Sequence, residues 1–197
     1  MKYLTDILNN RNITYVCNEP MAAHTTFKIG GAADILITVR SIDELQTAVN
    51  ACKACDIPLM ILGNGSNLLV SDNGIEGAVI MLDGDFKEIT VDGTIITSGA
   101  GAKLSRLCSV ALENSLTGLE FAYGIPGTVG GAMYMNAGAY GGEMKDVALS
   151  VTALTADGEL REVPAEELQL GYRTSVFKTN GDIILFSKYK LEQGDQA

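Results

Sequence analysis

Apolar and polar positions in the first part of the chain alternate between short strand-like runs and one helical stretch. The β-branched run 35–39 predicts a buried strand. Ser41 and Glu44 form a capping box, which predicts the start of a helix. The apolar positions after it keep helical spacing at Leu45, Ala48, Val49 and Cys52. Apolar runs at 59–62 and 78–82 predict two more strands, so we expect the chain to begin with a small α/β unit.

From residue 86 onward the pattern changes to pairs of extended segments. The dipeptide Asp92-Gly93 favours a tight turn and predicts a hairpin over 89–98. A second hairpin is expected over 147–163, around Ala156-Asp157-Gly158. The other elements expected here are a helix at 103–114 and a closing strand at 183–191. A βαβ-like beginning followed by antiparallel hairpins with interspersed helices indicates an α+β fold class.

Two glycine-rich stretches indicate close approach of the backbone to a ligand. Residues 123–142 hold seven of the 22 glycines and one proline, so the backbone there can adopt positive φ and pack closely. Residues 63–68 form a polar turn between apolar runs, where backbone N–H groups, Ser66 and Asn67 could surround an anion. The alternatives are a tight structural loop and a simple Asx or Ser turn. Neither spacing fits a P-loop or the dinucleotide fingerprint, so a large phosphorylated cofactor would need another scaffold.

Composition narrows the class of protein. The chain of 197 residues is 47% hydrophobic and 19% charged, which is typical of a soluble protein with a sizeable core. Its net charge of -10 argues against a nucleic-acid partner and against anionic membrane surfaces. No apolar run approaches about eighteen residues and the N-terminus lacks the apolar core of a signal peptide. We therefore expect a cytoplasmic protein.

The cysteines and the one histidine give little support to metal or redox chemistry. The cysteines are Cys17, Cys52, Cys55 and Cys108. Cys52 and Cys55 form a Cys-x-x-Cys pair late in the expected helix, away from a helix start where thiolates are activated. We expect buried structural thiols, with redox or metal binding as the alternative, and we expect no metal site around His24.

Five glycine-containing motifs follow one another along the chain: residues 63–67, 118–120, 124–132, 136–141 and 171–178. In this order they resemble the motifs of the flavin-dependent UDP-N-acetylenolpyruvoylglucosamine reductases of bacterial cell-wall synthesis. The resemblance covers the chain from about Thr25 onward. The resemblance implies the two-lobed FAD-binding fold of the vanillyl alcohol oxidase (PCMH) type, with the flavin between the lobes. The lobes expected from the sequence are 1–83 and 84–197.

The resemblance also implies which residues contact the cofactor. In the first lobe they are Gly63, Asn64, Gly65, Ser66, Asn67 and Leu68. In the second lobe they are Gly124, Ile125, Pro126, Gly127, Thr128, Gly130, Gly131, Ala132, Asn136, Gly138, Ala139 and Tyr140. Thr128 is expected to start a short helix. Because His24 lies outside both glycine loops in the sequence, we expect non-covalent FAD.

Arg173 is the expected catalytic residue. Its planar fork suits a carboxylate or enolate, and the family's arginine in the matching Tyr-Arg-x-Ser segment binds the substrate and stabilises an enolate-like intermediate. Tyr172 and Ser175 are the other expected substrate-binding residues. The alternative for Arg173 is a surface ion pair with one of three acidic residues, Glu162, Glu166 or Glu167.

The resemblance implies an enzyme that uses NADPH and FAD to reduce UDP-N-acetylglucosamine enolpyruvate to UDP-N-acetylmuramate for peptidoglycan synthesis. We expect a monomer. The family's third domain, which carries a serine proton donor, has no match in this sequence, so we expect these residues to bind FAD without activity of their own. The alternatives are another FAD-dependent oxidoreductase of the same fold and a non-catalytic flavin-binding module.

Overall fold

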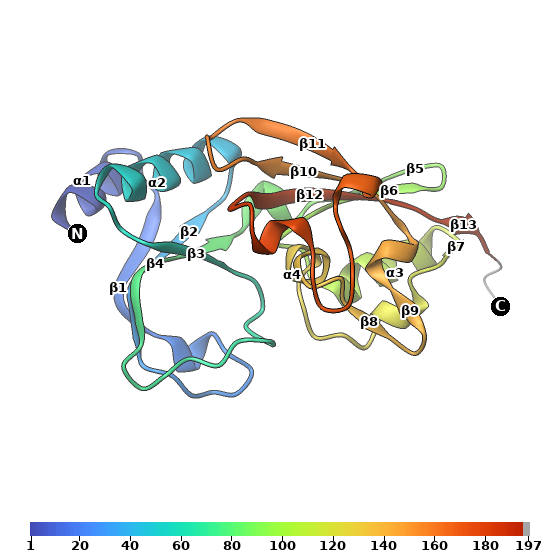
Figure 1. The fold of residues 1–197 in the computed structure, drawn as a ribbon, viewed down its shortest axis with the longest axis horizontal. Helices are drawn as coiled ribbons and strands as arrows, with labels where there is room; N and C mark the ends of the chain where they lie inside the picture. The colour runs from blue at the N-terminus through green and yellow to red at the C-terminus, as the bar shows by residue number, and fades with distance from the viewer. Residues whose placement is uncertain (195–197) are drawn as a thin grey trace. The chain divides into compact units, whose positions relative to one another are not determined.

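The computed structural model describes residues 1–194 and divides into two compact units, Met1–Asp85 and Phe86–Ala197 (Figure 1). The division falls close to the boundary expected from the sequence. Each unit has its own sheet, and within the described part of the chain no helix is long and apolar enough to cross a bilayer.

The first unit is built on a four-stranded sheet with strand order β1-β2-β4-β3. Its strands are β1 (Thr14–Pro20), β2 (Ala32–Val39), β3 (Leu59–Leu62) and β4 (Ile75–Leu82), and its helices are α1 (Lys2–Asn10) and α2 (Ile42–Ala54). Strand β1 pairs antiparallel with β2, whereas β2 and β3 run parallel to β4. The two helices lie on one face of the sheet and contact each other (Figure 1).

Strand β2 is buried on both faces, as its apolar run predicts. Leu36 belongs to a core cluster that also contains Leu62, Val70 and Val79. Ile35 and Ile37 are fully buried and point to the opposite face by the alternation of a strand. The sheet therefore separates two apolar layers, as in an α/β unit.

The capping residues of α2 confirm the predicted helix start. Ser41 Oγ accepts a hydrogen bond from the Glu44 N–H at 3.3 Å, and Glu44 Oε2 accepts one from the Arg40 N–H at 2.7 Å. The return bond thus reaches one residue before the N-cap rather than the N-cap itself. Both bonds satisfy donors that have no partner within the helix.

The second unit is built on a five-stranded sheet with the order β11-β10-β12-β6-β5. Its strands are β5 (Ile89–Asp92), β6 (Ile95–Gly99), β10 (Ala148–Leu154), β11 (Leu160–Pro164) and β12 (Ile183–Lys190). All neighbours pair antiparallel, and both predicted hairpins are confirmed, as β5–β6 and β10–β11. The closing strand β12 lies between them and joins them into one sheet, which with the first unit confirms the α+β prediction.

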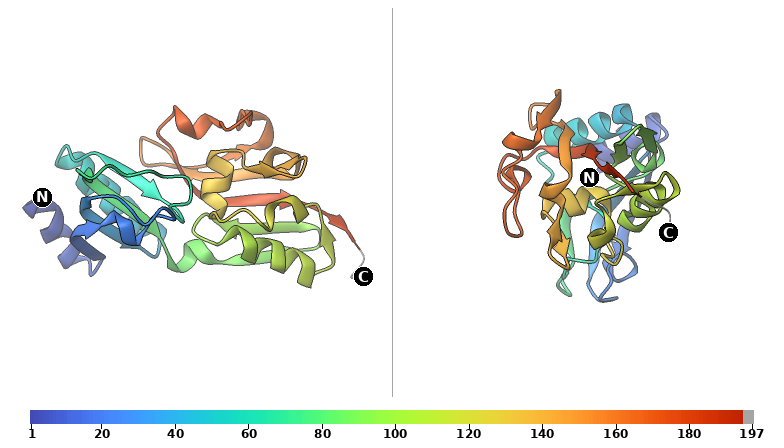
Figure 2. Two further views of the ribbon diagram at one scale, coloured as in Figure 1. Left: turned by 90° about the horizontal axis from the view of Figure 1, so that it is seen from below. Right: turned by 90° about the vertical axis from the view of Figure 1, so that its right-hand side faces the viewer.

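Shorter elements of the second unit carry the glycine-rich stretch. Helices α3 (Leu104–Glu113) and α4 (Val129–Tyr134) lie on the same face of the five-stranded sheet, as Figure 1 and Figure 2 show from two directions. The two-stranded pairs are β7 (Leu116–Thr117) with β13 (Glu192–Gln193), and β8 (Gly138–Ala139) with β9 (Gly142–Glu143).

Short 3₁₀ helices occur in both units. Within residues 1–194 they are η1 (Met21–Ala23), η2 (Gly84–Lys87), η3 (Glu120–Ala122), η4 (Met144–Asp146), η5 (Ala165–Glu167) and η6 (Val176–Lys178).

The expectation of buried thiols holds for two cysteines and is wrong for Cys17. Cys52 and Cys108 are buried, and Cys55 at the end of α2 is half-buried. Cys17 is exposed and lies in the edge strand β1, none of whose residues is buried. Burial raises the pKa of the Cys52 and Cys108 thiols to about 11.

Candidate functional site

The first glycine loop is fixed against the segment that follows η1. Gly65 has φ +61°, and a Cβ built on it would lie 1.9 Å from the His24 carbonyl oxygen. The Gly65 carbonyl accepts a hydrogen bond from the Thr26 N–H at 3.1 Å. Ser66 is half-buried and Asn67 is exposed in the same loop. Sequence reasoning did not bring His24 and Gly65 together, because residues far apart in the chain carry no local signal of their contact.

The segment behind this loop has bonds of its own. His24 Nε2 and Glu19 Oε1 are 2.7 Å apart, and Thr25 Oγ1 donates to the Ile29 carbonyl at 3.0 Å. The His24 side chain is thus engaged with Glu19, and its backbone carbonyl lies beside Gly65. Among residues 1–194, no three histidine, cysteine or acidic side chains gather in a way that could hold a metal ion.

In the second unit, residues 124–132 contain glycines with different surroundings. At Gly124 an added Cβ would meet no atom within 4 Å, and the residue is exposed. At Gly130 an added Cβ would lie 2.8 Å from the Ala100 Cβ, and the Gly130 N–H donates to the Ala100 carbonyl at 2.9 Å. The fold therefore requires a glycine at 130, whereas Gly124 leaves an open backbone that a ligand can approach.

Helix α4 begins within this stretch, as expected. Thr128 is its N-cap, and its Oγ1 accepts a hydrogen bond from the Gly131 N–H at 3.3 Å. Thr128 also forms an isolated β-bridge with Lys103. These contacts hold the start of the helix next to α3.

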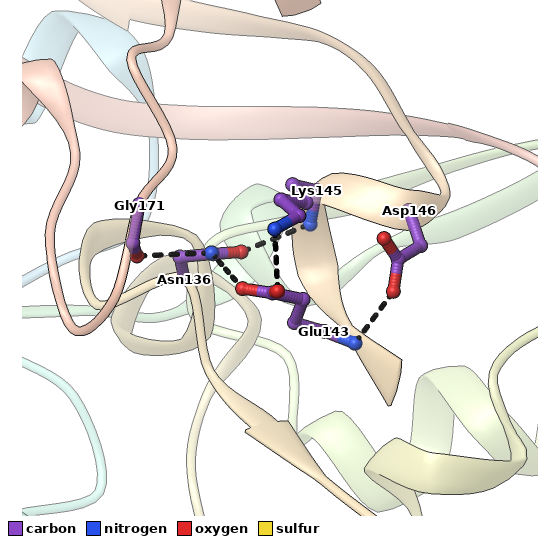
Figure 3. Close-up of polar contacts among 5 residues, drawn as sticks. All are labelled: Asn136, Glu143, Lys145, Asp146 and Gly171. Atoms are coloured by element: carbon purple, nitrogen blue, oxygen red, sulfur yellow. Dashed lines mark hydrogen bonds and ion pairs between the residues drawn. The ribbon is translucent and has the colours of Figure 1, made fainter. Parts of the chain in front are cut away.

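Asn136 lies at the centre of a polar network in the second unit (Figure 3). It is 3% exposed and has φ +43°. Its Nδ2 donates to Glu143 Oε2 at 2.5 Å and to the Gly171 carbonyl at 3.0 Å. Its Oδ1 accepts from the Lys145 N–H at 2.9 Å. The buried amide thus uses both donor hydrogens and its acceptor.

Glu143 was not among the residues predicted from the sequence. Its Oε1 lies 2.5 Å from Lys145 Nζ, and its N–H donates to Asp146 Oδ2 at 2.9 Å. The bond from Lys145 is the main cause that lowers the pKa of the Glu143 carboxyl, with the bond from Asn136 as a smaller one. A sequence signal existed: Glu143 and Asp146 form a capping box at the start of η4.

The Arg173 segment forms a turn whose side chains face solvent. The Gly171 N–H donates to the Thr174 carbonyl at 3.2 Å, and the Thr174 N–H donates to the Gly171 carbonyl at 3.3 Å. Arg173 is exposed with φ +54°, and its carbonyl accepts from Lys178 Nζ at 3.3 Å. Tyr172 is 92% exposed.

The ion-pair alternative for Arg173 finds no support in the structure. Glu162 pairs with Lys188 at 2.7 Å, and Glu167 pairs with Arg161. Within residues 1–194, the Arg173 guanidinium makes no ion pair. The arginine is therefore available to an anionic ligand.

Ser175 has a structural contact. It is 4% exposed, and its Oγ donates to the Tyr134 carbonyl at 2.7 Å. This bond ties the end of the Arg173 segment to the last residue of α4. The substrate-binding role expected for Ser175 stays a prediction, for a hydroxyl whose hydrogen is already engaged.

A pocket of about 300 Å³ gathers several of the predicted residues within the second unit. It is lined by Asn136, Gly138, Ala139, Tyr140, Gly141, Gly142, Glu143, Tyr172 and Arg173. The pocket brings the expected flavin-contacting residues of 136–140 next to Tyr172 and Arg173, and it adds Glu143. Residues 124–132 do not line it, and residues 63–68 belong to the first unit. An arginine without an ion pair in an open pocket suits a carboxylate or phosphate ligand.

Comparison with known proteins identifies the cofactor class. Residues 33–164 match the family model described as "FAD binding domain". The chain is 42% identical over 200 residues to the UDP-N-acetylenolpyruvoylglucosamine reductase of Lachnoclostridium phytofermentans, covering 100% of this chain and 64% of that protein. It is 50% identical over 186 residues to the one of Agathobacter rectalis, covering 88% of this chain and 59% of that protein. The chain thus spans about three fifths of the length of these relatives.

Solved structures give the same result for the fold. The crystal structure of UDP-N-acetylenolpyruvylglucosamine reductase from Thermus caldophilus matches with a TM-score of 0.80 and 38% identity, over 93% of this chain and 64% of that one. Physcomitrella patens BBE-like 1 matches with a TM-score of 0.69 and 16% identity, over 96% of this chain and 44% of that one. Cholesterol oxidase from Brevibacterium sterolicum matches with a TM-score of 0.71 and 15% identity, over 93% of this chain and 38% of that one.

The last two likenesses concern the fold alone. Together with the family model and the Thermus caldophilus reductase, they confirm the vanillyl alcohol oxidase (PCMH) type of FAD-binding fold expected from the sequence. The agreement of the family model, the relatives and the fold leaves one assignment. The chain belongs to the FAD binding domain family and is a homologue of the N-terminal, FAD-binding portion of the UDP-N-acetylenolpyruvoylglucosamine reductases.

Proposed function

We propose that the chain is the FAD-binding portion of an enzyme that reduces UDP-N-acetylglucosamine enolpyruvate to UDP-N-acetylmuramate with NADPH, a step of peptidoglycan synthesis. The observation that carries the proposal is Arg173, which makes no ion pair within residues 1–194 and lines the pocket beside Asn136. It does so in a chain 42% to 50% identical to reductases of this name.

The residues present fit FAD in their chemistry. In the first unit, residues 63–68 would hold it, with Ser66 and Asn67 as neutral donors. In the second unit, residues 124–132 would hold it, where the open backbone at Gly124 allows close approach. Backbone N–H groups and neutral side-chain donors can bind a diphosphate by hydrogen bonds without an ion pair. When bound, FAD supplies the hydride chemistry that no amino-acid side chain provides.

Arg173 is the proposed catalytic residue. The enolpyruvyl group of the substrate carries a carboxylate and becomes enolate-like as it is reduced. A guanidinium fork binds the carboxylate in two places and stabilises the added charge, which develops only as the reaction proceeds. The carboxylate of Glu143 lines the same pocket, but it is held by Lys145 at 2.5 Å. The pocket therefore offers Arg173 to the substrate without a competing free carboxylate from Glu143.

The proposal extends to the wider setting of the reaction. Because the chain spans 59% to 64% of the length of these relatives, we expect their remaining residues to be needed for turnover. We also propose a cytoplasmic location, since nucleotide-linked sugars and NADPH are cytoplasmic metabolites. A monomeric state is a further part of the proposal, and light scattering of the purified chain checks it.

Substrate titration of the FAD-loaded chain tests the proposal. Binding of UDP-N-acetylglucosamine enolpyruvate is followed by the change in the flavin absorption band. Arg173→Lys keeps the charge and removes the planar fork, so we expect its affinity to fall by about tenfold or more. Arg161→Lys is the matched control, because Arg161 is paired with Glu167 outside the pocket. Equal substrate affinity in the unchanged protein, Arg173→Lys and Arg161→Lys would contradict the role proposed for Arg173.

A further inference from the structure

The orientation of the Asn136 amide is fixed by its three partners. A backbone N–H, from Lys145, faces one end of the amide, so that end must be the oxygen. A carboxylate and a carbonyl, from Glu143 and Gly171, face the other end, so that end must be the nitrogen. Glu143 is thus one of the groups that decide which way the amide points.

The amide in turn holds the Arg173 turn at its first residue. The Gly171 carbonyl accepts from Asn136 Nδ2 and also from the Thr174 N–H that closes the turn. Tyr172 and Arg173 form the tip between these two residues, and Arg173 is held at φ +54°, a conformation that disfavours a side chain. A strained tip persists only where its ends are fixed, and Asn136 fixes one of them.

The far end of the turn has a separate tie. Ser175 Oγ donates to the Tyr134 carbonyl at 2.7 Å, without any contact with Glu143. A change at Glu143 therefore releases one end of the turn and leaves the other end in place. Such a change is local, which makes its effect measurable.

We propose that Glu143 is a positioning residue for Arg173, acting through the Asn136 amide and the Gly171 carbonyl (Figure 3). The inference rests on the function proposed for Arg173. Glu143 is not a proton donor in this arrangement, because its carboxylate accepts hydrogen bonds from Asn136, Lys145 and the Asp146 N–H. Its negative charge orients the amide, and the amide orients the turn.

Limited trypsin digestion of the full chain tests this inference without flavin or substrate. Trypsin cuts after arginine, so the bond after Arg173 reports how often the turn leaves its place. Glu143→Gln presents an NH₂ group toward either Lys145 or Asn136, both of which are donors, so the network loses a bond. We expect cleavage after Arg173 to become at least about fivefold faster, while cleavage after Arg161 keeps its rate.

The matched control is Glu162→Gln. Glu162 also accepts from a lysine, Lys188, and from a second side chain, Ser150, but it lies outside the pocket. We expect this variant to digest at Arg173 as the unchanged protein does. An unchanged rate after Arg173 in Glu143→Gln would overturn the inference, and so would equal acceleration at Arg173 and Arg161, which indicates general loosening.

A milder change and a double-mutant cycle complete the test. Glu143→Asp keeps the charge but withdraws it by one carbon, and we expect an intermediate rate of cleavage after Arg173.

In the substrate titration, Glu143→Gln should weaken substrate binding when Arg173 is present and have no further effect in an Arg173→Ala background. Additive effects would overturn positioning through Arg173. Because digestion needs no ligand, failure of the proposed function and failure of this inference give different results.

Discussion

The His24 carbonyl oxygen lies where a side chain at position 65 would begin: a Cβ on Gly65 would be 1.9 Å from it. The same glycine has φ +61°, and its own carbonyl accepts from the Thr26 N–H. Two requirements, space and conformation, therefore coincide at one residue of the first glycine loop.

We predict that Gly65→Ala destabilises the protein much more than Gly93→Ala does. Gly93 has a similar φ of +57°, but an added Cβ there would meet nothing within 4 Å. Gly93→Ala should cost about 1 to 2 kcal/mol for the left-handed conformation. Gly65→Ala adds a clash with rigid backbone, so it should cost at least about 1 to 3 kcal/mol more. Urea unfolding followed by circular dichroism checks this, and equal midpoints for the two variants would refute it.

We predict that alanine at two glycines of residues 124–132 affects stability to different degrees. Gly130→Ala puts a methyl group 2.8 Å from the Ala100 Cβ and should lower stability by about 1 to 3 kcal/mol. Gly124→Ala meets no atom within 4 Å and should leave the unfolding midpoint nearly unchanged. If FAD approaches the backbone at Gly124, the same variant should bind FAD at least about tenfold more weakly. Wild-type FAD affinity in Gly124→Ala would remove this glycine from the proposed cofactor contacts.

The elements that the sequence predicted are those with local signals. Asp92-Gly93 determined a hairpin, and Ser41 with Glu44 determined a helix start, because the residues that make these features are neighbours in the chain. The order of strands in the five-stranded sheet could not be predicted this way. Strand β12 pairs with both β10 and β6, and nothing within 183–190 specifies those partners.

For the candidate site, the sequence predicted residues but not the contacts between them. The resemblance implied Asn136 as a cofactor contact and Arg173 as the catalytic residue, but it did not show that the Asn136 amide bonds to the Gly171 carbonyl, 35 residues away. It also could not separate glycines that the fold needs, such as Gly130, from an open one, such as Gly124. Glu143 was missed because its bond to Asn136, seven residues earlier, forms only once the β8–β9 pair brings the two residues together. Its capping box with Asp146 signals the start of a helix rather than a site.

We predict that the cysteines react in a definite order with a thiol reagent at pH 8. Cys17 is exposed and should react first. Cys52 and Cys108 are buried, and burial raises the pKa of each to about 11, so the thiolate is rare at this pH. We expect them to react at least about 100-fold more slowly than Cys17. Labelling followed by mass spectrometry checks the order, and rapid labelling of Cys108 in the folded protein would contradict it.

The same thiols predict a loss of stability at alkaline pH. Burial raises the pKa of Cys52 and Cys108 from 9.0 to about 11, so the folded chain keeps protons that the unfolded chain releases. This contribution is fully present below pH 9 and is lost as the pH rises from 9 to about 11. The unfolding midpoint should therefore fall over this range, and less so in a Cys52→Ala, Cys108→Ala variant. An identical fall in both proteins would show that other groups are responsible.

We predict that this chain retains FAD, and the absorption spectrum of the desalted protein shows whether it does. The purified chain is incubated with excess FAD, passed through a desalting column and compared with an untreated sample whose folding is verified by circular dichroism. We predict a shifted flavin band that remains with the protein, and a smaller retained fraction for Gly124→Ala. A folded chain that loses all of its flavin would show that these residues do not form an FAD site of their own.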